Sequence, residues 1–445
     1  MVESEWLMQE QGRREIDSAV AVPKASGRST EARNSVRLCF HECALLRFVF
    51  LEIQVTKPSG FPWSPRRSYH LLMALLSVAL TAASVSAAHA DSVVVIGYAG
   101  ALTGPQAHLG KDIERGIRLA IDEINALHPI IAGVPTSFRL DAQDDAGDPR
   151  TATLIAQRFI DSGVNAVVGH QSSGTSIAVA RLYAAANIAE ITPSATNPQF
   201  TRLGYRTTFR LLANDDFLGT AMSRYSIDTL HARRVAVLDD RTAYGQGLAD
   251  VFVDATRRGG GTIVAREYTS DKATDFNSSL TLFKGNRPDA IFFGGVDAQA
   301  GPMLRQMKKL GVSAPLLGGD GICTRELPRL AGDPPAVNLY CADGGLSLSA
   351  MPGGLSFERK FHAKFGDQVQ LYAPYAYDAM MAVYRAIVQA RSVRPEQIVD
   401  ALHSVEFKGV TGQISFDGAG DLRMPAATIS TFKDHKKVTL VEIKK

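Results

Sequence analysis

Two short polar stretches carry the side chains best suited to binding a small charged molecule. The first reads GHQSSGTS over residues 169–176, and the second reads TPSATNP over residues 192–198. Each directly follows a short apolar run, at 164–168 and at 188–191. Hydroxyl side chains and the free backbone N–H groups at the start of a helix are typical ligands for an anion, such as a carboxylate or a phosphate.

The pattern around these stretches is that of strand, loop, helix, strand and loop. Ile177, Ala180 and Ala184 share one face of the intervening helix, which we expect to begin near Thr175. Parallel strands bring both loops to one edge of the sheet. Neither glycine-rich phosphate motif is present, so a carboxylate is the better ligand. Alternatively the hydroxyls only cap the helix and fill turns. Two such loops at one crevice favour a site.

Composition and alternation indicate a two-lobed α/β protein. The chain has 445 residues, of which 45% are hydrophobic and 21% charged, and its net charge of +3 gives no reason to expect a nucleic-acid partner. Strands and helices alternate from Ser92, and the alternation restarts after Leu211. We therefore expect two parallel sheets flanked by helices, with their loop edges facing a cleft.

Three loops of the second half each offer one notable residue: Tyr244, Val296 and Asp320. A further acidic run, 144–148, lacks the spacing of a calcium loop. Asp148 as the helix cap and Pro149 as the first helical residue explain the end of that run better. We expect no metal and no cofactor.

The N-terminal 90 residues call for separate treatment. Arg66 and Arg67 precede an apolar stretch, 71–88, that ends in the small-residue pattern Ala-His-Ala at 88–90. This is typical of a cleaved signal peptide over 66–90 and predicts a periplasmic protein. A membrane anchor is the alternative, but the stretch is rich in Ala and Ser and lacks a basic stop-transfer flank. Residues 1–65 are then a non-native or unstructured extension, with a strand pattern only at 47–55.

Cys323 and Cys341 are the only cysteines that follow the signal peptide. Export to an oxidising compartment favours a disulfide between them, and two separate buried thiols are the alternative.

At this point the chain from 91 to 445 resembles the branched-chain amino-acid binding proteins of ABC importers, the leucine/isoleucine/valine type. The motifs that carry the resemblance are Leu102-Thr103-Gly104-Pro105, Asp144-Asp145 with Asp148-Pro149, Gly169-His170 with Ser172-Ser173, Thr192-Pro193-Ser194-Ala195-Thr196, Tyr244-Gly245-Gln246-Gly247 and Tyr372-Ala373-Pro374-Tyr375-Ala376-Tyr377-Asp378.

The resemblance implies a type I periplasmic-binding-protein fold with a three-stranded hinge. The crossings fall near Asn214, Gly344 and Asp421. Residues 91–214 and 344–421 would form the N-terminal lobe, and residues 215–343 and 422–445 the C-terminal lobe.

The resemblance also implies the ligand contacts. Ser173 and Thr196 would bind the amino acid's carboxylate, and Ser194 would offer backbone groups to both of its ends. Asp320 would face the ammonium across the cleft, and Tyr244 would close over the ligand. Burying either charge unpaired would be costly, so this division of donors and acids makes physical sense.

Two positions depart from the family's pattern. Leu109 and Val296 stand where the family often has aromatic residues, and both border the pocket for the ligand's side chain. The family's disulfide near the first lobe has no counterpart, because Ala146 and Ser172 stand there. A disulfide between Cys323 and Cys341 would instead cross-link the second lobe.

We therefore expect a monomeric periplasmic receptor, not an enzyme. It would capture a free apolar amino acid and deliver it to the permease and ATPase subunits of an ABC importer. The alternative is a sensing domain for an amide or another small carboxylate on the same fold. Nucleophilic catalysis by His170 with Ser172 or Ser173 is disfavoured, because no G-x-S-x-G elbow is present and adjacent residues rarely point at each other.

The cleavage pattern predicts the N-terminus of the exported protein. N-terminal sequencing of the periplasmic form should read Asp-Ser-Val-Val, starting at Asp91. Exported material that still carried residues 1–65 would contradict this start.

Overall fold

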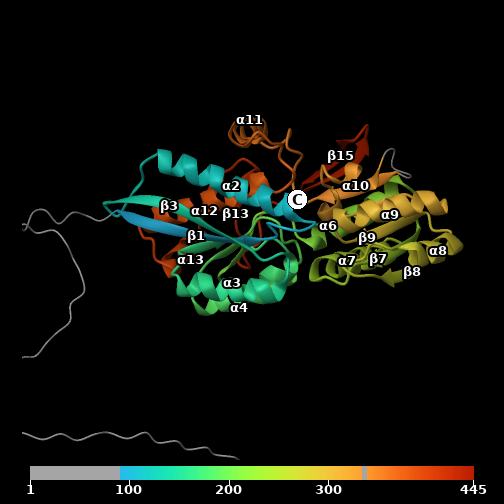
Figure 1. Ribbon diagram of the computed structural model, residues 1–445, viewed down its shortest axis with the longest axis horizontal. Helices are drawn as coiled ribbons and strands as arrows, with labels where there is room; N and C mark the ends of the chain where they lie inside the picture. The colour runs from blue at the N-terminus through green and yellow to red at the C-terminus, as the bar shows by residue number, and fades with distance from the viewer. Residues whose placement is uncertain (1–90, 333–337, 445) are drawn as a thin grey trace, which may run out of the picture. The chain divides into compact units, whose positions relative to one another are not determined.

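The computed structural model describes residues 91–332 and 338–444 (Figure 1). The expected signal peptide, the extension over 1–65 and the strand pattern at 47–55 lie outside these residues. Within the described part, no helix has both the length and the apolar character needed to cross a membrane.

The first sheet has six strands in the order β2-β3-β1-β4-β5-β6. Its strands pair in parallel, except that β2 is antiparallel to β3. The strands are β1 (Ser92–Gly100), β2 (Ile130–Ile131), β3 (Val134–Asp144), β4 (Ala166–Val168), β5 (Glu190–Thr192) and β6 (Thr208–Arg210).

Helices from two distant parts of the chain cover this sheet. In Figure 1, α2 lies on one side of β1, and α3 and α4 lie on the other. The early helices are α2 (Ala107–Ala126), α3 (Pro149–Asp161), α4 (Ser173–Ala185) and α5 (Gln199–Arg202). The later ones are α11 (Gly354–Phe365), α12 (Ala373–Ala390) and α13 (Pro395–Leu402), followed by the small hairpin β12 (Glu406–Lys408) and β13 (Gln413–Ser415).

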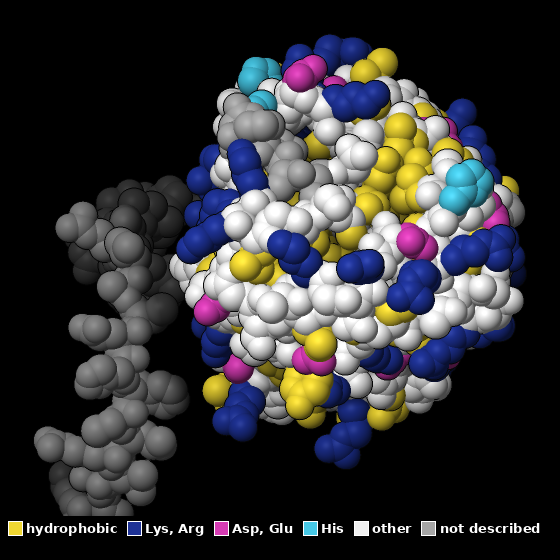
Figure 2. Space-filling model, turned by 90° about the vertical axis from the view of Figure 1, so that its right-hand side faces the viewer, with side chains coloured by type: hydrophobic (Ala, Val, Ile, Leu, Met, Phe, Trp, Pro, Cys, Tyr) yellow, Lys and Arg dark blue, Asp and Glu magenta, His cyan; other side chains and the backbone are white. Residues whose placement is uncertain are grey.

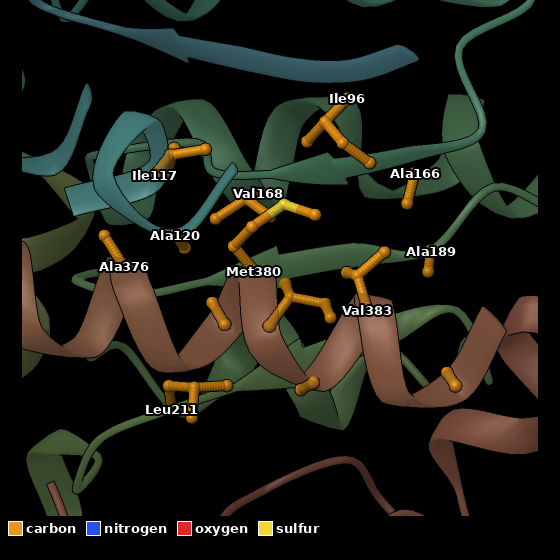
Figure 3. Close-up of a cluster of buried hydrophobic side chains, with 14 of the residues drawn as sticks. Ile96, Ile117, Ala120, Ala166, Val168, Ala189, Leu211, Ala376, Met380 and Val383 are labelled. Atoms are coloured by element: carbon orange, nitrogen blue, oxygen red, sulfur yellow. The ribbon is translucent and has the colours of Figure 1, made fainter. Parts of the chain in front are cut away.

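The first lobe's core joins α12 to the sheet and to α2. Figure 3 shows Met380 and Val383 of α12 pointing toward Val168 and Ala189 of the sheet region. Ile117 and Ala120 bring the face of α2 to the same cluster (Figure 3). All of these side chains are buried, so the first lobe depends on a helix encoded more than 200 residues after its first strand.

The second sheet has seven strands in the order β15-β14-β11-β10-β9-β7-β8. They are β7 (Arg234–Asp239), β8 (Thr262–Tyr268), β9 (Ala290–Gly294), β10 (Leu316–Gly318), β11 (Leu339–Asp343), β14 (Ala426–Lys433) and β15 (Lys436–Lys444). The last two run antiparallel, so this sheet is parallel only from β8 to β11. The end of the chain, 426–444, forms one long hairpin at the edge of this sheet.

The helical elements of the second lobe follow the same alternation. They are α6 (Asp215–Arg224), a π-helical turn η1 (Tyr225–Thr229), α7 (Ala243–Arg258), α8 (Asn277–Asn286), α9 (Asp297–Leu310), a 3₁₀ turn η2 (Asp320–Ile322) and α10 (Leu327–Ala331). Figure 2 looks at the end of the molecule where α8 and α9 lie in Figure 1. Lys and Arg side chains are spread widely over this face, and hydrophobic side chains gather most densely at its upper right, with smaller groups near the lower edge (Figure 2).

The helix starts follow ordinary capping chemistry. Asp148 accepts a hydrogen bond from the Thr151 N–H and Pro149 is the first residue of α3, as predicted. Asn214 caps α6 in the same way, so this helix begins at Asp215. Helix α2 begins at Ala107 without a side-chain cap.

The three expected hinge crossings are bonded to one another. The Ala213 N–H donates to the carbonyl of Gly344 at 3.0 Å. The Asn214 side chain donates to Asp421 at 3.2 Å, and Arg210 donates to the same carboxylate at 2.8 Å. The lobe boundaries given by the sequence stay predictions, but these contacts place all three segments together.

A disulfide joins Cys323 to Cys341, with their Cα atoms 5.5 Å apart. It links the turn after η2 to strand β11 inside the second lobe, and both residues are fully buried.

The disulfide predicts a redox-dependent stability. The bond closes a loop of 18 residues, and removing it should cost about 3 kcal/mol because the reduced chain has more freedom when unfolded. Urea unfolding with and without reductant measures this cost. A thiol assay on denatured, unreduced protein should find both cysteines blocked, and two reactive thiols would contradict the bond.

Candidate functional site

The first polar loop ends in a tightly capped helix. Ser172 and Thr175 form a reciprocal capping box, so α4 begins at Ser173 and not near Thr175. Ser173 and Gly174 therefore occupy the first two helical positions, where backbone N–H groups have no partner within a helix. These N–H groups and the positive end of the helix dipole suit an anion.

Side-chain hydrogen bonds lock the two polar loops together. The Thr192 hydroxyl donates to the carbonyl of His170 at 3.0 Å and accepts from the Ala195 N–H at 2.9 Å. The Ser194 hydroxyl donates to the carbonyl of Gln171 at 2.7 Å. The Asn197 N–H donates to the Ser173 hydroxyl at 3.2 Å. The expected neighbourhood of the two loops is thus present, and the Ser194 side chain serves to join them.

Arg210 binds the backbone of the second polar loop. Its guanidinium is fully buried and donates to the carbonyls of Ala195 and Asn197, at 2.7 and 3.0 Å. It also pairs with Asp421 at 2.8 Å. One cation therefore couples the candidate binding loop to the hinge.

Thr196 faces an acidic centre formed with Asp215 and Asp320. The Thr196 hydroxyl oxygen and both carboxylate oxygens of Asp215 are buried and have no hydrogen bond of ordinary geometry among the described residues. Burial raises the pKa of Asp215 well above its usual range, the charge of Asp320 raises it further, and the Thr196 hydroxyl lowers it. An incoming donor or cation would relieve this cluster of acceptors.

Asp320 is held by phenols from both lobes. Tyr244 donates to one carboxylate oxygen and Tyr372, at the start of α12, donates to the other, each at 2.8 Å. Burial raises the pKa of Asp320 to about 6, although these two hydrogen bonds lower it. Asp320 is thus more than a turn residue, because its carboxylate links the two lobes.

A second interlobe contact lies beside Leu109 and Val296. His108 pairs with the fully buried Asp297 at 2.8 Å. Burial lowers the pKa of His108, but the hydrogen bond and charge of Asp297 outweigh this and raise it. His108 and Asp297 are the chain neighbours of Leu109 and Val296, so the contact joins the two segments that carry the expected pocket positions. Leu109 is itself buried in the core of the first lobe, and Val296 is the residue just before α9.

The ring of His170 faces away from the serines beside it. Its two nitrogens lie 3.3 Å from Asp145 and 3.0 Å from the Tyr183 hydroxyl, and all three residues are buried. Neither nitrogen contacts Ser172 or Ser173 in this arrangement. The geometry is that of a structural histidine whose carbonyl anchors the two loops.

Several residues of this site escaped the sequence analysis. Asp215 follows the hinge segment and not an apolar run, so the pattern of polar loops after strands does not indicate it. Tyr372 stood in a recognised motif without an assigned role. His108 and Asp297 directly neighbour Leu109 and Val296 in the sequence. This adjacency is the feature of the sequence that could have indicated them. Among the described residues, no cluster of three or more His, Cys, Asp or Glu side chains has the geometry of a metal site.

Comparison with known proteins agrees with this geometry. A model of the family described as "Periplasmic binding protein" matches residues 93–434. This chain belongs to the periplasmic binding protein family. The assignment rests on nearly the whole described part of the chain, so both lobes are covered.

Individual relatives are similar over almost their full length. An amino acid binding protein of Pseudomonas aeruginosa is 32% identical over 364 residues, which are 82% of this chain and 96% of that protein. The leucine binding protein LivK of Thermotoga maritima has a TM-score of 0.73 at 27% identity, over 79% of this chain and 98% of that one. The branched-chain amino acid transporter substrate binding protein LivJ of Streptococcus pneumoniae, solved with isoleucine, has a TM-score of 0.70 at 27% identity, over 80% and 99%.

The raised pKa of Asp215 predicts a variant with greater stability. Because the folded-state pKa lies above the unfolded value, this carboxyl makes folding less favourable as the pH rises above about 4. Asp215→Asn keeps the shape and should raise the free energy of unfolding at pH 7 by about 1 kcal/mol or more, with little gain near pH 4. Urea unfolding at the two pH values tests this. Asp216→Asn, at the half-exposed neighbouring position, is the matched control. A loss of stability in Asp215→Asn at pH 7 would contradict the prediction.

Proposed function

We propose that this protein is the solute-binding receptor of an ABC importer. It captures a free amino acid, branched-chain or otherwise apolar, between its two lobes and delivers it to the permease and ATPase subunits. It acts in the periplasm, after removal of the signal peptide over 66–90. The observation that carries the proposal is the buried acidic cluster, in which the Thr196 hydroxyl and both oxygens of Asp215 lack an ordinary hydrogen bond and Asp320 is held by two phenols.

The two ends of this site suit the two charges of an amino acid. Ser173, with the first N–H groups of α4, forms the pole that receives the carboxylate, and Thr196 adds its hydroxyl. Asp320 and Asp215 form the acidic pole that receives the ammonium. Ser194 adds backbone groups between the poles, and Tyr244 covers the ligand while it donates to Asp320. Each charge of the zwitterion is then paired when the cleft excludes water.

The amino-acid assignment takes its support from relatives and from the lining of the pocket. The Pseudomonas relative is named an amino acid binding protein, and the Streptococcus relative was solved with isoleucine. Leu109 and Val296 present aliphatic side chains at the two pocket positions. An aliphatic lining without rings leaves room for a branched side chain and offers it no hydrogen-bond partner.

Closure of the lobes is the step that retains the ligand. Tyr372–Asp320 and His108–Asp297 join side chains of different lobes. A ligand that pairs with both lobes favours this closed arrangement, since hinge closure buries a small solute. The permease then distinguishes the closed receptor from the open one. This is a binding cycle and involves no chemical step.

The decisive prediction concerns Asp320. In Asp320→Asn the shape is kept and the charge is lost, so the ammonium of L-leucine is left poorly compensated. Its affinity should fall by about 2–5 kcal/mol, or roughly 30- to 5,000-fold. Isothermal titration of the chain from Asp91 measures this directly.

Two controls accompany this test. Asp254→Asn removes an exposed carboxylate from α7 of the same lobe and should leave the affinity unchanged. 4-Methylpentanoate, which has the carboxylate and side chain of leucine without the ammonium, should bind wild type and Asp320→Asn almost equally weakly. Equal leucine affinity in folded wild type and Asp320→Asn would mean that Asp320 does not pair with the ammonium, and it would favour an amide or simple carboxylate as the natural ligand.

A further inference from the structure

A cavity lies between segments of the two lobes, and its lining residue Asp343 is close enough to the acidic centre to raise the pKa of Asp320. Its volume is about 640 Å³, which falls within the roughly 300–1,000 Å³ of small-molecule sites. The first lobe contributes 346–349 and 368–371 with Met351, Glu358, Pro374 and Tyr375, and the second contributes Arg325, Asp343 and the tip of the β14–β15 hairpin. The described residues that line it do not include Ser173, Thr196, Tyr244 or Asp320.

Two unpaired acceptors border this cavity, one from each lobe. Asp343 is only 5% exposed, and its Oδ1 has no hydrogen-bond partner among the described residues. The side-chain oxygen of Gln370 is also buried and unpaired. Asp112 accepts the backbone N–H of Gln370 at 2.9 Å and so fixes this residue in place. Buried acceptors without donors are costly, so a ligand that supplies two or more N–H groups would stabilise this wall.

Lys437 and Arg325 of the second lobe supply positive charge to the cavity. Lys437 donates to Asp343 Oδ2 at 3.0 Å and to the carbonyl of Cys323 at 3.2 Å. An ammonium has three donors, so one remains for a ligand. Arg325 also lines the cavity and binds Gln368 across the lobes at 3.0 Å. Glu358 lies 3.8 Å from Arg325 and offsets part of its charge.

The first lobe also brings apolar side chains to the wall, beside the polar Ser347, Ser349 and Tyr375. The apolar residues are Leu346, Leu348, Met351, Val369, Leu371 and Pro374. The cavity therefore combines unpaired acceptors, cationic donors and an aliphatic surface, and these are the three features that an apolar amino acid requires.

We propose that this cavity is a second binding site, for a zwitterionic amino acid with an apolar side chain. The ammonium binds Asp343 Oδ1 and Gln370 Oε1, the carboxylate binds Lys437 and Arg325, and the side chain packs on the aliphatic wall. The choice of ligand rests on the proposed function, whereas the existence of the site rests on the cavity itself.

Occupation of this site favours the closed arrangement, because its ligand contacts both lobes. By linkage, an amino acid bound there raises the affinity of the cleft, and an amino acid in the cleft raises the affinity of the second site. The receptor would then bind most firmly when its ligand is abundant.

Titration of the chain from Asp91 with L-leucine, up to about 10 mM, tests the proposal because this range covers a Kd of about 1 mM. Wild type should show two saturable events. Gln370→Met keeps the shape and removes the acceptor, and it should retain only the tighter event. Asp343→Asn should weaken the second event about tenfold or more, because it removes the charge opposite the ammonium. Asp254→Asn, on the exposed face of α7, should keep both events.

A variant whose cleft no longer binds the amino acid distinguishes this proposal from the proposed function. Ser173→Ala with Asp320→Asn should keep the weaker event alone, and 4-methylpentanoate should not reproduce it. A single wild-type event that vanishes in this double variant would overturn the second site and leave the proposed function standing. A single event that survives there and is lost in Gln370→Met would overturn the proposed function and leave the second site. Two events unaffected by both Gln370→Met and Asp343→Asn would place the weaker one outside this cavity.

Discussion

The burial of two carboxylates in one cleft is the constraint on which the rest of the site depends. Burial raises the pKa of both Asp215 and Asp320, and the charge of Asp320 raises the pKa of Asp215 further. Tyr244 and Tyr372 offset part of this cost at Asp320. These buried acids make folding less favourable at neutral pH, and a cation that paired with them would offset this cost.

A buried arginine links the second polar loop to the hinge. Arg210 holds the carbonyls of the second polar loop and the carboxylate of Asp421 at once. A buried guanidinium cannot lose these partners cheaply, since an unpaired buried charge costs several kcal/mol. Movement at the hinge and the position of the loop at Thr196 are therefore coupled through one side chain, without any need for a long pathway.

The sequence predicts the framework and the polar loops well, because their signals are local. Asp148 and Pro149 mark a helix start, and the two Ser/Thr-rich loops follow buried strands. The role of Tyr372 was not predictable in this way, since it depends on a contact with Asp320 across 52 residues. The hairpin of β14 and β15 was also missed. Its turn residues, Asp434 and His435, both have positive φ, yet they lack the glycine or asparagine pair that usually signals such a turn.

The order of the chain has a consequence for folding kinetics. The first six strands are made early, but the helix α12 that completes their core follows the whole parallel part of the second sheet. The first lobe cannot bury Ile117 or Val168 until that helix arrives, whereas β7 to β11 are contiguous and can pair at once. Contacts between such distant segments slow folding. The second lobe should therefore form first, and the first lobe should expose its apolar sheet face for longest, where chaperones would bind.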